Sequence, residues 1–272
     1  MPDTSYSALH EEACTKGEKT YTDPDTGYQV FTRLGLLERD RCCGAGCRHC
    51  PFGHDAVSVA ERARRIQQAA WLTDHRPGPG ERLQVLFWSG GKDSYLAYRA
   101  LARKGEMPIV LLTTFDACSR IIAHQEFAID EVVAQATHLG LPVLGVPLHS
   151  GVEYVDHIGT ALELVPGCDR LCFGDLHLEH IREWREDAFG GHPRTQDIAL
   201  SFPLWNANYD TLLYDLAVSG AKCVVSAVDP DLAAVSIGDE FGPELIKVLP
   251  EGMDAFGENG EFHTHVMFAV SD

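Results

Sequence analysis

Short apolar runs alternate with amphipathic segments in the chain from residue 83 onward. The apolar runs predict buried strands at 83–88, 108–115, 141–148, 170–174, 198–205 and 221–228. The amphipathic segments predict helices over 94–104 and 125–139, and from about residues 176 and 209 onward. Strands that are apolar throughout need cover on both faces, so the alternation predicts an α/β fold with a parallel, doubly wound sheet. Ligands of such sheets bind at the carboxyl ends of the strands.

The first third of the chain has a different pattern. Residues 1–55 are polar and rich in turn residues, and they end in a cluster of cysteines. A helix is predicted over 56–74 from the apolar residues Val59, Ala63, Ile66 and Ala70. Its outer face is predicted to carry Glu61, Arg62, Arg64 and Arg65. The run HRPGPGER then reads as a linker. We therefore expect a cysteine-rich module (1–55), a helix with a linker (56–82) and an α/β domain (83–272).

Composition narrows the function classes. The formal net charge of -18 repels phosphate backbones and disfavours broad nucleic-acid binding. No apolar stretch is long enough to cross a bilayer, and the first residues carry no secretory pattern, so we expect a cytoplasmic protein with no membrane partner. Nine cysteines, four of them within nine positions, fit a reducing compartment and a metal site better than a disulfide framework.

The strongest motif follows the predicted strand 83–88, where the chain reads Ser-Gly-Gly-Lys-Asp-Ser. Glycine permits a tight turn and a close backbone approach to a ligand. Successive N–H groups and the start of the next helix then make an anion-binding cradle. Hydroxyl donors and a lysine charge complete it, so we expect phosphate binding by Ser89, Gly90, Gly91, Lys92, Asp93 and Ser94.

This motif resembles the PP-loop of ATP pyrophosphatases, which cleave ATP between the α and β phosphates, and it lacks the spacing of a Walker A loop. The resemblance implies an adenine nucleotide alpha hydrolase-like fold, ATP and Mg²⁺ as cofactors, pyrophosphate held by the loop, and Asp93 placing Mg²⁺. It further implies adenine near the end of the second strand, around Thr113, Thr114, Phe115 and Asp116. The alternative for each of these four is an ordinary strand-end residue.

The C-terminal stretch GMDAFGENGEFHTHV is the second informative one. Asn259-Gly260 is a strong signal for a two-residue β-hairpin, which would bring the carboxylates of Glu258 and Glu261 close together. Beyond the turn, Glu261, His263 and His265 are predicted to share one strand face. Such a cluster can bind a cation, orient ammonia or relay a proton, while the alternative is a solvated hairpin tip.

GENGEFHT after VVSAVDP, together with FGDLHLEHIREW, is similar to the diphthine–ammonia ligase family, in its bacterial-type branch. The resemblance runs from about Leu83 to Phe268. It implies that the chain adenylates a carboxylate and forms an amide with ammonia. It also implies that Glu258 and Glu261 line the substrate and ammonia side, with Asp175 near the cleft. His263 stands where many members carry a glutamate, so only the reaction type is carried over.

The cysteine cluster contains Cys42, Cys43, Cys47 and Cys50, with glycines between them. Thiolates this dense repel one another unless they are protonated or bound to metal. A zinc ribbon would need a second, separate cysteine pair, so an iron–sulfur cluster comes first, zinc second and unmetallated thiols third. The segment also resembles a short cysteine-rich module of unknown function.

The leading hypothesis is an ATP-dependent amide ligase that acts on a small-molecule or protein carboxylate with ammonia or an amine. Lys92, Asp93, Glu258, Glu261 and His263 are its predicted catalytic residues, and Thr114 and Phe115 are predicted to bind the nucleotide. A sulfur transferase assisted by an iron–sulfur cluster is the second hypothesis. A nucleotide-binding or redox-sensing module without turnover is the third. The acceptor substrate and the oligomeric state, a homo-oligomer included, stay open.

Overall fold

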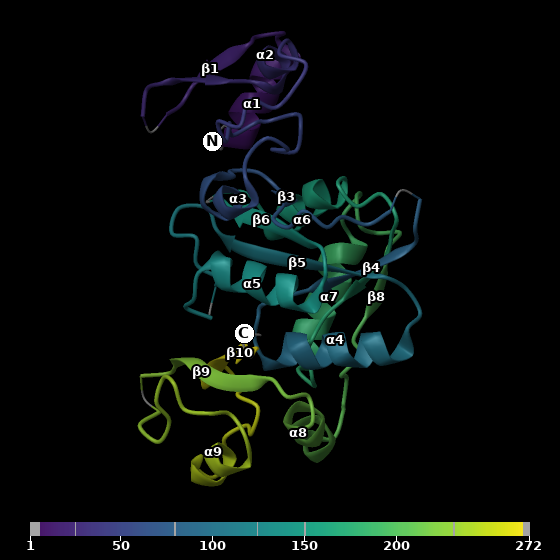
Figure 1. The fold of residues 1–272 in the computed structure, drawn as a ribbon, viewed down its shortest axis with the longest axis vertical. Helices are drawn as coiled ribbons and strands as arrows, with labels where there is room; N and C mark the ends of the chain where they lie inside the picture. Colours follow the sequence, from purple (N-terminus) through teal and green to yellow (C-terminus); the bar gives the residue numbers. More distant parts are fainter. Residues whose placement is uncertain are drawn as a thin grey trace.

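The architecture was established from a computed structural model. It describes residues 6–24, 26–78, 80–123, 125–149, 151–230 and 232–268. Within this part of the chain, a small N-terminal module lies above a six-stranded sheet with helices on both faces, and a two-stranded sheet lies below it (Figure 1). No helix in these ranges is long and apolar enough to span a membrane.

The central sheet has the strand order β3-β6-β5-β4-β7-β8. Its members are β3 (Ala70–Trp71), β4 (Leu83–Phe87), β5 (Ile109–Asp116), β6 (Val143–Leu148), β7 (Cys168–Cys172) and β8 (Ala199–Ser201). The strands from β4 to β8 pair in parallel, and only the edge strand β3 runs antiparallel to its neighbour. The predicted parallel sheet is confirmed for the strands at 83–88, 108–115, 141–148, 170–174 and 198–205.

Alternate residues of each central strand enter different cores, which makes the sheet doubly wound. Leu111 of β5 packs with α4 (Lys92–Lys104) and α5 (Ile129–Leu139). Its neighbours in sequence, Val110 and Leu112, pack with α6 (Tyr154–Leu162) and α7 (Glu179–Gly190). Helices α4 and α5 each end at a glycine with positive φ, Gly105 and Gly140. The backbone N–H of each glycine donates to a carbonyl of the last helical turn, and the chain then reverses toward the next strand. The helix α6 was not predicted.

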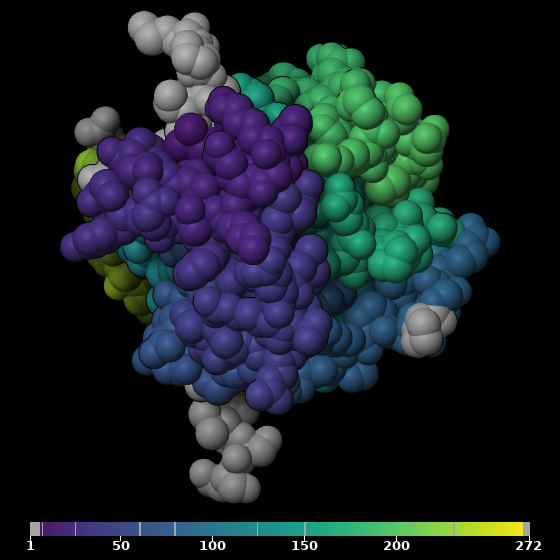
Figure 2. Space-filling model, turned by 90° about the horizontal axis from the view of Figure 1, so that it is seen from above, coloured from purple at the N-terminus to yellow at the C-terminus, as the bar shows by residue number. Residues whose placement is uncertain are grey.

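The N-terminal module contains helices and strands for which the sequence analysis made no prediction. It contains α1 (Tyr6–Thr15), the hairpin of β1 (Thr20–Thr22) with β2 (Gln29–Phe31), and α2 (Arg33–Leu37). Thr32 begins α2 by accepting a hydrogen bond from the backbone N–H of Gly35. The cysteines follow in an irregular loop. Seen from above, the module lies over one end of the sheet domain (Figure 2).

The helix predicted over 56–74 is wrong in extent. Only α3 (Val59–Arg65) is helical, and the chain is extended at Ile66 before it reaches β3. The periodic apolar residues Ile66 and Ala70 are indeed fully buried, but from two different elements. Arg62 is not on an outer face: it is 4 % exposed and donates hydrogen bonds to the carbonyls of Val57 and Trp71.

The prediction that the segment 221–228 continues the parallel sheet is wrong. Strand β9 (Lys222–Val228) instead pairs antiparallel with β10 (Phe262–Met267), and the two form a separate sheet. Only Cys223 and Val225 of β9 are buried, so the strand needs cover on one face and is stable in an antiparallel pair. Helix α8 (Tyr209–Ala217) precedes β9, and α9 (Pro243–Val248) lies in the long connection to β10.

Candidate active site

A cleft of about 750 Å³ opens at the carboxyl ends of β4, β5, β6 and β7. This is the edge at which parallel α/β sheets bind ligands, and the volume is in the range of cofactor sites. The loop Ser89–Ser94 forms one wall, and the segment from Gly257 to Thr264, which leads into β10, forms another. The second sheet therefore completes a site whose centre lies on the first.

The loop between β4 and α4 is tightly packed around two glycines. Gly90 has a φ of 81°, and a Cβ atom there would lie 2.8 Å from the side-chain oxygen of Gln135. A Cβ atom on Gly91 would lie 2.9 Å from the carbonyl oxygen of Thr264. Ser94 closes the loop by donating to the carbonyl of Gly91 at 2.9 Å. Because Gly91 directly precedes the first residue of α4, the positive end of this helix points into the loop.

Two polar side chains from distant parts of the sequence hold this loop. The side-chain nitrogen of Gln135, in α5, donates to the carbonyl oxygens of Gly90 (2.9 Å) and Val266 (2.7 Å). The Trp88 indole donates to the oxygen of the same amide at 2.8 Å. From β10, the Thr264 hydroxyl accepts the backbone N–H of Lys92 at 3.0 Å. Neither Gln135 nor Thr264 was predicted, although a glutamine on the apolar face of α5 was a signal.

Lys92 and Asp93 form an ion pair at the base of the cleft, with 2.8 Å between Nζ and Oδ2. Burial alone would lower the pKa of Lys92, but the Asp93 carboxylate outweighs it and the pKa lies above its usual value. The pKa of Asp93 is raised by burial. The other carboxylate oxygen of Asp93, Oδ1, is buried and has no hydrogen-bond partner among the described residues. A lone carboxylate oxygen beside a phosphate cradle suits a hard cation such as Mg²⁺.

Glu258 faces this pair from the opposite wall. Burial raises the pKa of its carboxyl group to about 8, and the charge of Asp93 adds to the shift while Lys92 opposes it. Glu258 is therefore mostly protonated at neutral pH. Among the predicted residues, His263 also lines the cleft, next to Thr264. The cleft thus places a neutral acid within electrostatic reach of the lysine–aspartate pair.

Glu261 lies outside the lining of the cleft. Its carboxylate accepts hydrogen bonds from the backbone N–H groups of Asn259 (2.9 Å) and Asp254 (3.3 Å) and from the Asn259 amide (3.1 Å). The predicted two-residue β-hairpin is wrong: the turn closes from Gly260 N–H to Gly257 O, and β10 pairs with β9 instead of with the preceding residues. The Glu258 carboxyl group therefore lies in the cleft, whereas the Glu261 carboxylate is bound by the turn that precedes it.

Of the remaining residues considered in the sequence analysis, some line the cleft and others do not. His265 packs its ring against Phe127, 4.3 Å between centroids, and faces Glu131. Thr114 lines the cleft as predicted, whereas Phe115 is fully buried in the core and does not. Asp116 accepts the backbone N–H groups of the turn that follows β5, those of Cys118 and Ser119. The predicted nucleotide contact at Phe115 is thus not supported by its position.

Residues 82–188 match the family described as Diphthamide synthase N-terminal domain. The fold is of the PP-loop type. Residues 9–56 match a family of unknown function, DUF5522. Among solved structures, the U34-tRNA thiolase NcsA from Methanococcus maripaludis with its 4Fe-4S cluster is similar at 13 % identity, over 74 % of this chain and 71 % of that one, with a TM-score of 0.32. At that score the likeness says nothing about the activity of this chain.

The far wall of the PP-loop cleft contains an ion pair that was only partly predicted. Asp175, expected near the cleft, accepts two hydrogen bonds from Arg185 of α7, at 2.6 and 3.0 Å. The Arg185 guanidinium also lies over the Phe173 ring, 4.3 Å from its centroid. Tyr154 lies nearby, and burial raises its pKa to about 12. This wall combines apolar surface with paired charges.

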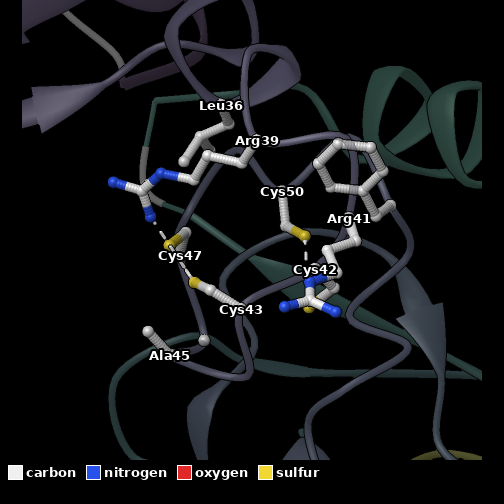
Figure 3. A pocket seen from close by; sticks show the side chains of 10 residues that line it. Leu36, Arg39, Arg41, Cys42, Cys43, Ala45, Cys47 and Cys50 are labelled. Atoms are coloured by element: carbon white, nitrogen blue, oxygen red, sulfur yellow. Dashed lines mark hydrogen bonds between the residues drawn. The ribbon is translucent and has the colours of Figure 1, made fainter.

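The four cysteines of the N-terminal module line one small recess of about 10 Å³ (Figure 3). They form two pairs: the Sγ atoms of Cys43 and Cys47 are 3.9 Å apart, and those of Cys42 and Cys50 are 3.8 Å apart. Within the described ranges, no three His, Cys, Asp or Glu side chains are arranged to hold one metal ion. Metal binding by these cysteines stays a prediction at this point.

Proposed function

We propose that this chain is an ATP-dependent ligase that adenylates a carboxylate or carbonyl oxygen, releases pyrophosphate, and joins the activated carbon to ammonia or an amine. The observation that carries the proposal is the Asp93 carboxylate, which gives one oxygen to Lys92 and leaves the other buried without a partner in the described chain. The glycine loop at the end of β4 suits the phosphates of a nucleoside triphosphate, and the free carboxylate oxygen suits its divalent cation.

Each part of the loop has a separate task in this proposal. The backbone N–H groups around Gly91 and the hydroxyls of Ser89 and Ser94 bind the departing phosphates. Lys92 neutralises the charge that builds up on them. Asp93 Oδ1 would hold Mg²⁺, which would supply further positive charge to neutralise the departing phosphates. Thr114, at the end of β5, lies on the side of the cleft where the resemblance expects adenine.

Glu258 is the residue best placed to handle the proton of the nucleophile. Burial raises its pKa to about 8, close enough to neutral pH for the carboxyl group both to release and to accept a proton, as general acid–base catalysis requires. Ammonia at neutral pH is present mostly as ammonium, so the ionised fraction of Glu258 would take up its proton before attack. The geometry favours Glu258 over Glu261 for this task, because only Glu258 lines the cleft.

Hydroxylamine trapping tests the reaction type without knowledge of the natural nucleophile. The enzyme is incubated with MgATP, hydroxylamine and a panel of carboxylates, and hydroxamate, AMP and pyrophosphate are measured. Equal amounts of the three products are expected, and the Asp93→Asn variant should make none. Cys118→Ser, which changes an exposed cysteine in the turn after β5, is the matched control. ADP and phosphate as the products would exclude adenylation.

A sulfur transferase is the second candidate, and the observation that favours it is the recess lined by four thiols. It shares the adenylation step and differs in the nucleophile. Sulfide in place of hydroxylamine should then yield a thiocarbonyl product, and ammonium should not react. The carboxylate panel, extended with carbonyl compounds, separates the two functions.

A further inference from the structure

The two cysteine pairs have the spacing that one metal imposes on two thiolates. Metal–sulfur bonds of about 2.3 Å at tetrahedral angles place two sulfurs about 3.8 Å apart. Cys43 with Cys47 (3.9 Å) and Cys42 with Cys50 (3.8 Å) each match this span. In Figure 3 the pairs lie side by side on the wall of one recess. Van der Waals contact between neutral thiols gives a similar distance, so the spacing needs a second observation.

That observation is the hydrogen bonding to sulfur. The backbone N–H of Gly44 donates to Cys42 Sγ at 3.4 Å. Cys43 accepts a backbone hydrogen bond from Ala45, and Cys50 accepts two, from Phe52 and His54. Three of these four donors lie two residues after the cysteine. A neutral thiol is a weak acceptor, whereas a metal-bound thiolate is a strong one, so the loop is built to receive thiolates.

Two glycines allow this loop to close. Gly44 and Gly46 have φ values of 76° and 69°, a region that favours glycine. A Cβ atom at Gly44 would lie 3.0 Å from the carbonyl oxygen of Ala56. The loop is fixed to the rest of the chain by the Gln68 amide, which donates to the carbonyl of Cys50 at 2.6 Å. The sulfurs are therefore held by ordered backbone at both ends of the loop.

We propose that the four cysteines hold a binuclear 2Fe–2S cluster, with Cys43 and Cys47 on one iron and Cys42 and Cys50 on the other. Each iron takes two protein thiolates, and bridging inorganic sulfides complete its tetrahedron. A single four-cysteine zinc ion would require the four side chains to converge on one point, and among the described residues no three side chains do so. The binuclear cluster also uses all four cysteines of the loop.

The charges around the recess fit such a cluster. Four thiolates and two sulfides leave a net negative charge on two ferric ions, and Arg39 and Arg41 both line the recess. Arg39 donates to Cys43 Sγ at 3.6 Å. Leu36, which is 3 % exposed, and Phe52 give the recess apolar walls that limit water access. The assignment rests on the module alone and is independent of the ligase proposed above.

The test is the metal and sulfide content of the full chain purified without oxygen. We expect about two iron atoms and about two acid-labile sulfides per chain, with visible absorbance that bleaches on reduction. One zinc per chain, iron without sulfide, or four iron atoms would each overturn the proposal, as would a chain that takes up no iron and sulfide on reconstitution. Reconstitution with iron and sulfide, and separately with zinc alone, distinguishes a cluster lost on purification from one that never forms.

Variants test the pairing. Cys43→Ser and Cys50→Ser each remove one ligand from a different iron, and either should lower iron and sulfide together because the sulfides bridge both metals. Cys118→Ser, outside the module, should leave both unchanged. Cys50 is buried and its variant can fail to fold, so the exposed Cys43 keeps the test decisive. Thermal unfolding of the ATP domain verifies folding in each variant. Full iron content in Cys43→Ser would overturn the assignment.

Discussion

The Thr264 hydroxyl accepts the backbone N–H of Lys92 at 3.0 Å, although 172 positions separate the two residues in sequence. The bond joins the second sheet to the phosphate-binding loop of the first. It satisfies a buried N–H group at the start of α4, so β10 helps to hold the loop in its shape. The nucleotide site is thus a property of the whole domain.

Thr264→Val should loosen the loop. The substitution keeps the shape of the side chain and removes the acceptor, which leaves the Lys92 N–H unsatisfied at a cost of about 1–3 kcal/mol. We expect a loss of stability of this size together with weaker MgATP binding by calorimetry. Thr264→Ser keeps the hydroxyl and should retain most of both. Equal behaviour of the Val and Ser variants would show that the hydrogen bond does not matter.

Gln135→Glu should destabilise the same loop from the other side. A carboxylate can still accept from Trp88 but cannot donate to the carbonyls of Gly90 and Val266, so it places charge against two oxygens. The expected loss is about 2–4 kcal/mol, and it should grow as the pH rises and the new carboxyl group ionises. Thr137→Ala, on the exposed side of α5, is the control and should cost less than about 0.5 kcal/mol. Denaturant unfolding at two pH values measures both.

The raised pKa of Glu258 predicts that the stability of the protein depends on pH. The pKa of this carboxyl group rises from 4.5 in the unfolded chain to about 8 in the folded protein, so the folded state binds the proton more tightly. This contribution is fully present below pH 4.5 and is lost as the pH rises through about 8. Glu258→Gln cannot ionise and should therefore gain stability relative to the parent between pH 5 and 8.5, by up to a few kcal/mol. Glu251→Gln, at an exposed position in the same region of the chain, is the matched control.

Glu261→Gln distinguishes a structural from a chemical role. The carboxylate accepts three hydrogen bonds from the turn it follows, and an amide oxygen can replace only part of them. We expect a stability loss of about 1 kcal/mol and hydroxamate formation at nearly the parent rate, whereas Glu258→Gln should nearly abolish it. Abolished product with unchanged stability in the Glu261 variant would return the catalytic role to Glu261, as the sequence predicted.

The sequence predicted what local pattern controls. Apolar runs such as 108–115 identified the parallel strands, and the glycines of the loop identified the phosphate cradle because backbone conformation there depends on residue type. The partner of a strand is not local information: 221–228 is apolar enough for either sheet, and only its one-sided burial in the folded domain shows which it joins. The same holds for Asn259-Gly260, whose turn was expected to join two paired strands.

The site residues also fall into two groups, those recognisable from a local motif and those brought in by long-range contacts. Lys92 and Asp93 were found from the motif, whereas Gln135 and Thr264 reach the loop across long separations that no spacing rule contains. Glu258 and Glu261 are equivalent in the sequence pattern and differ in the fold, because one points into the cleft and the other binds its own turn. Distinguishing them required the burial of each carboxyl group.

Strand β3 determines where a shortened form of the chain could begin. It pairs with β6, which without it would be the edge of the sheet. Leu72 then packs so closely on Gly145 that a Cβ atom there would lie 2.5 Å from the leucine side chain. A fragment that began at Leu83 would expose the unpaired main chain of β6, a template for association between copies. Residues 66–72 therefore cover this edge, and a truncated domain that keeps them is expected to associate less than one that begins at Leu83.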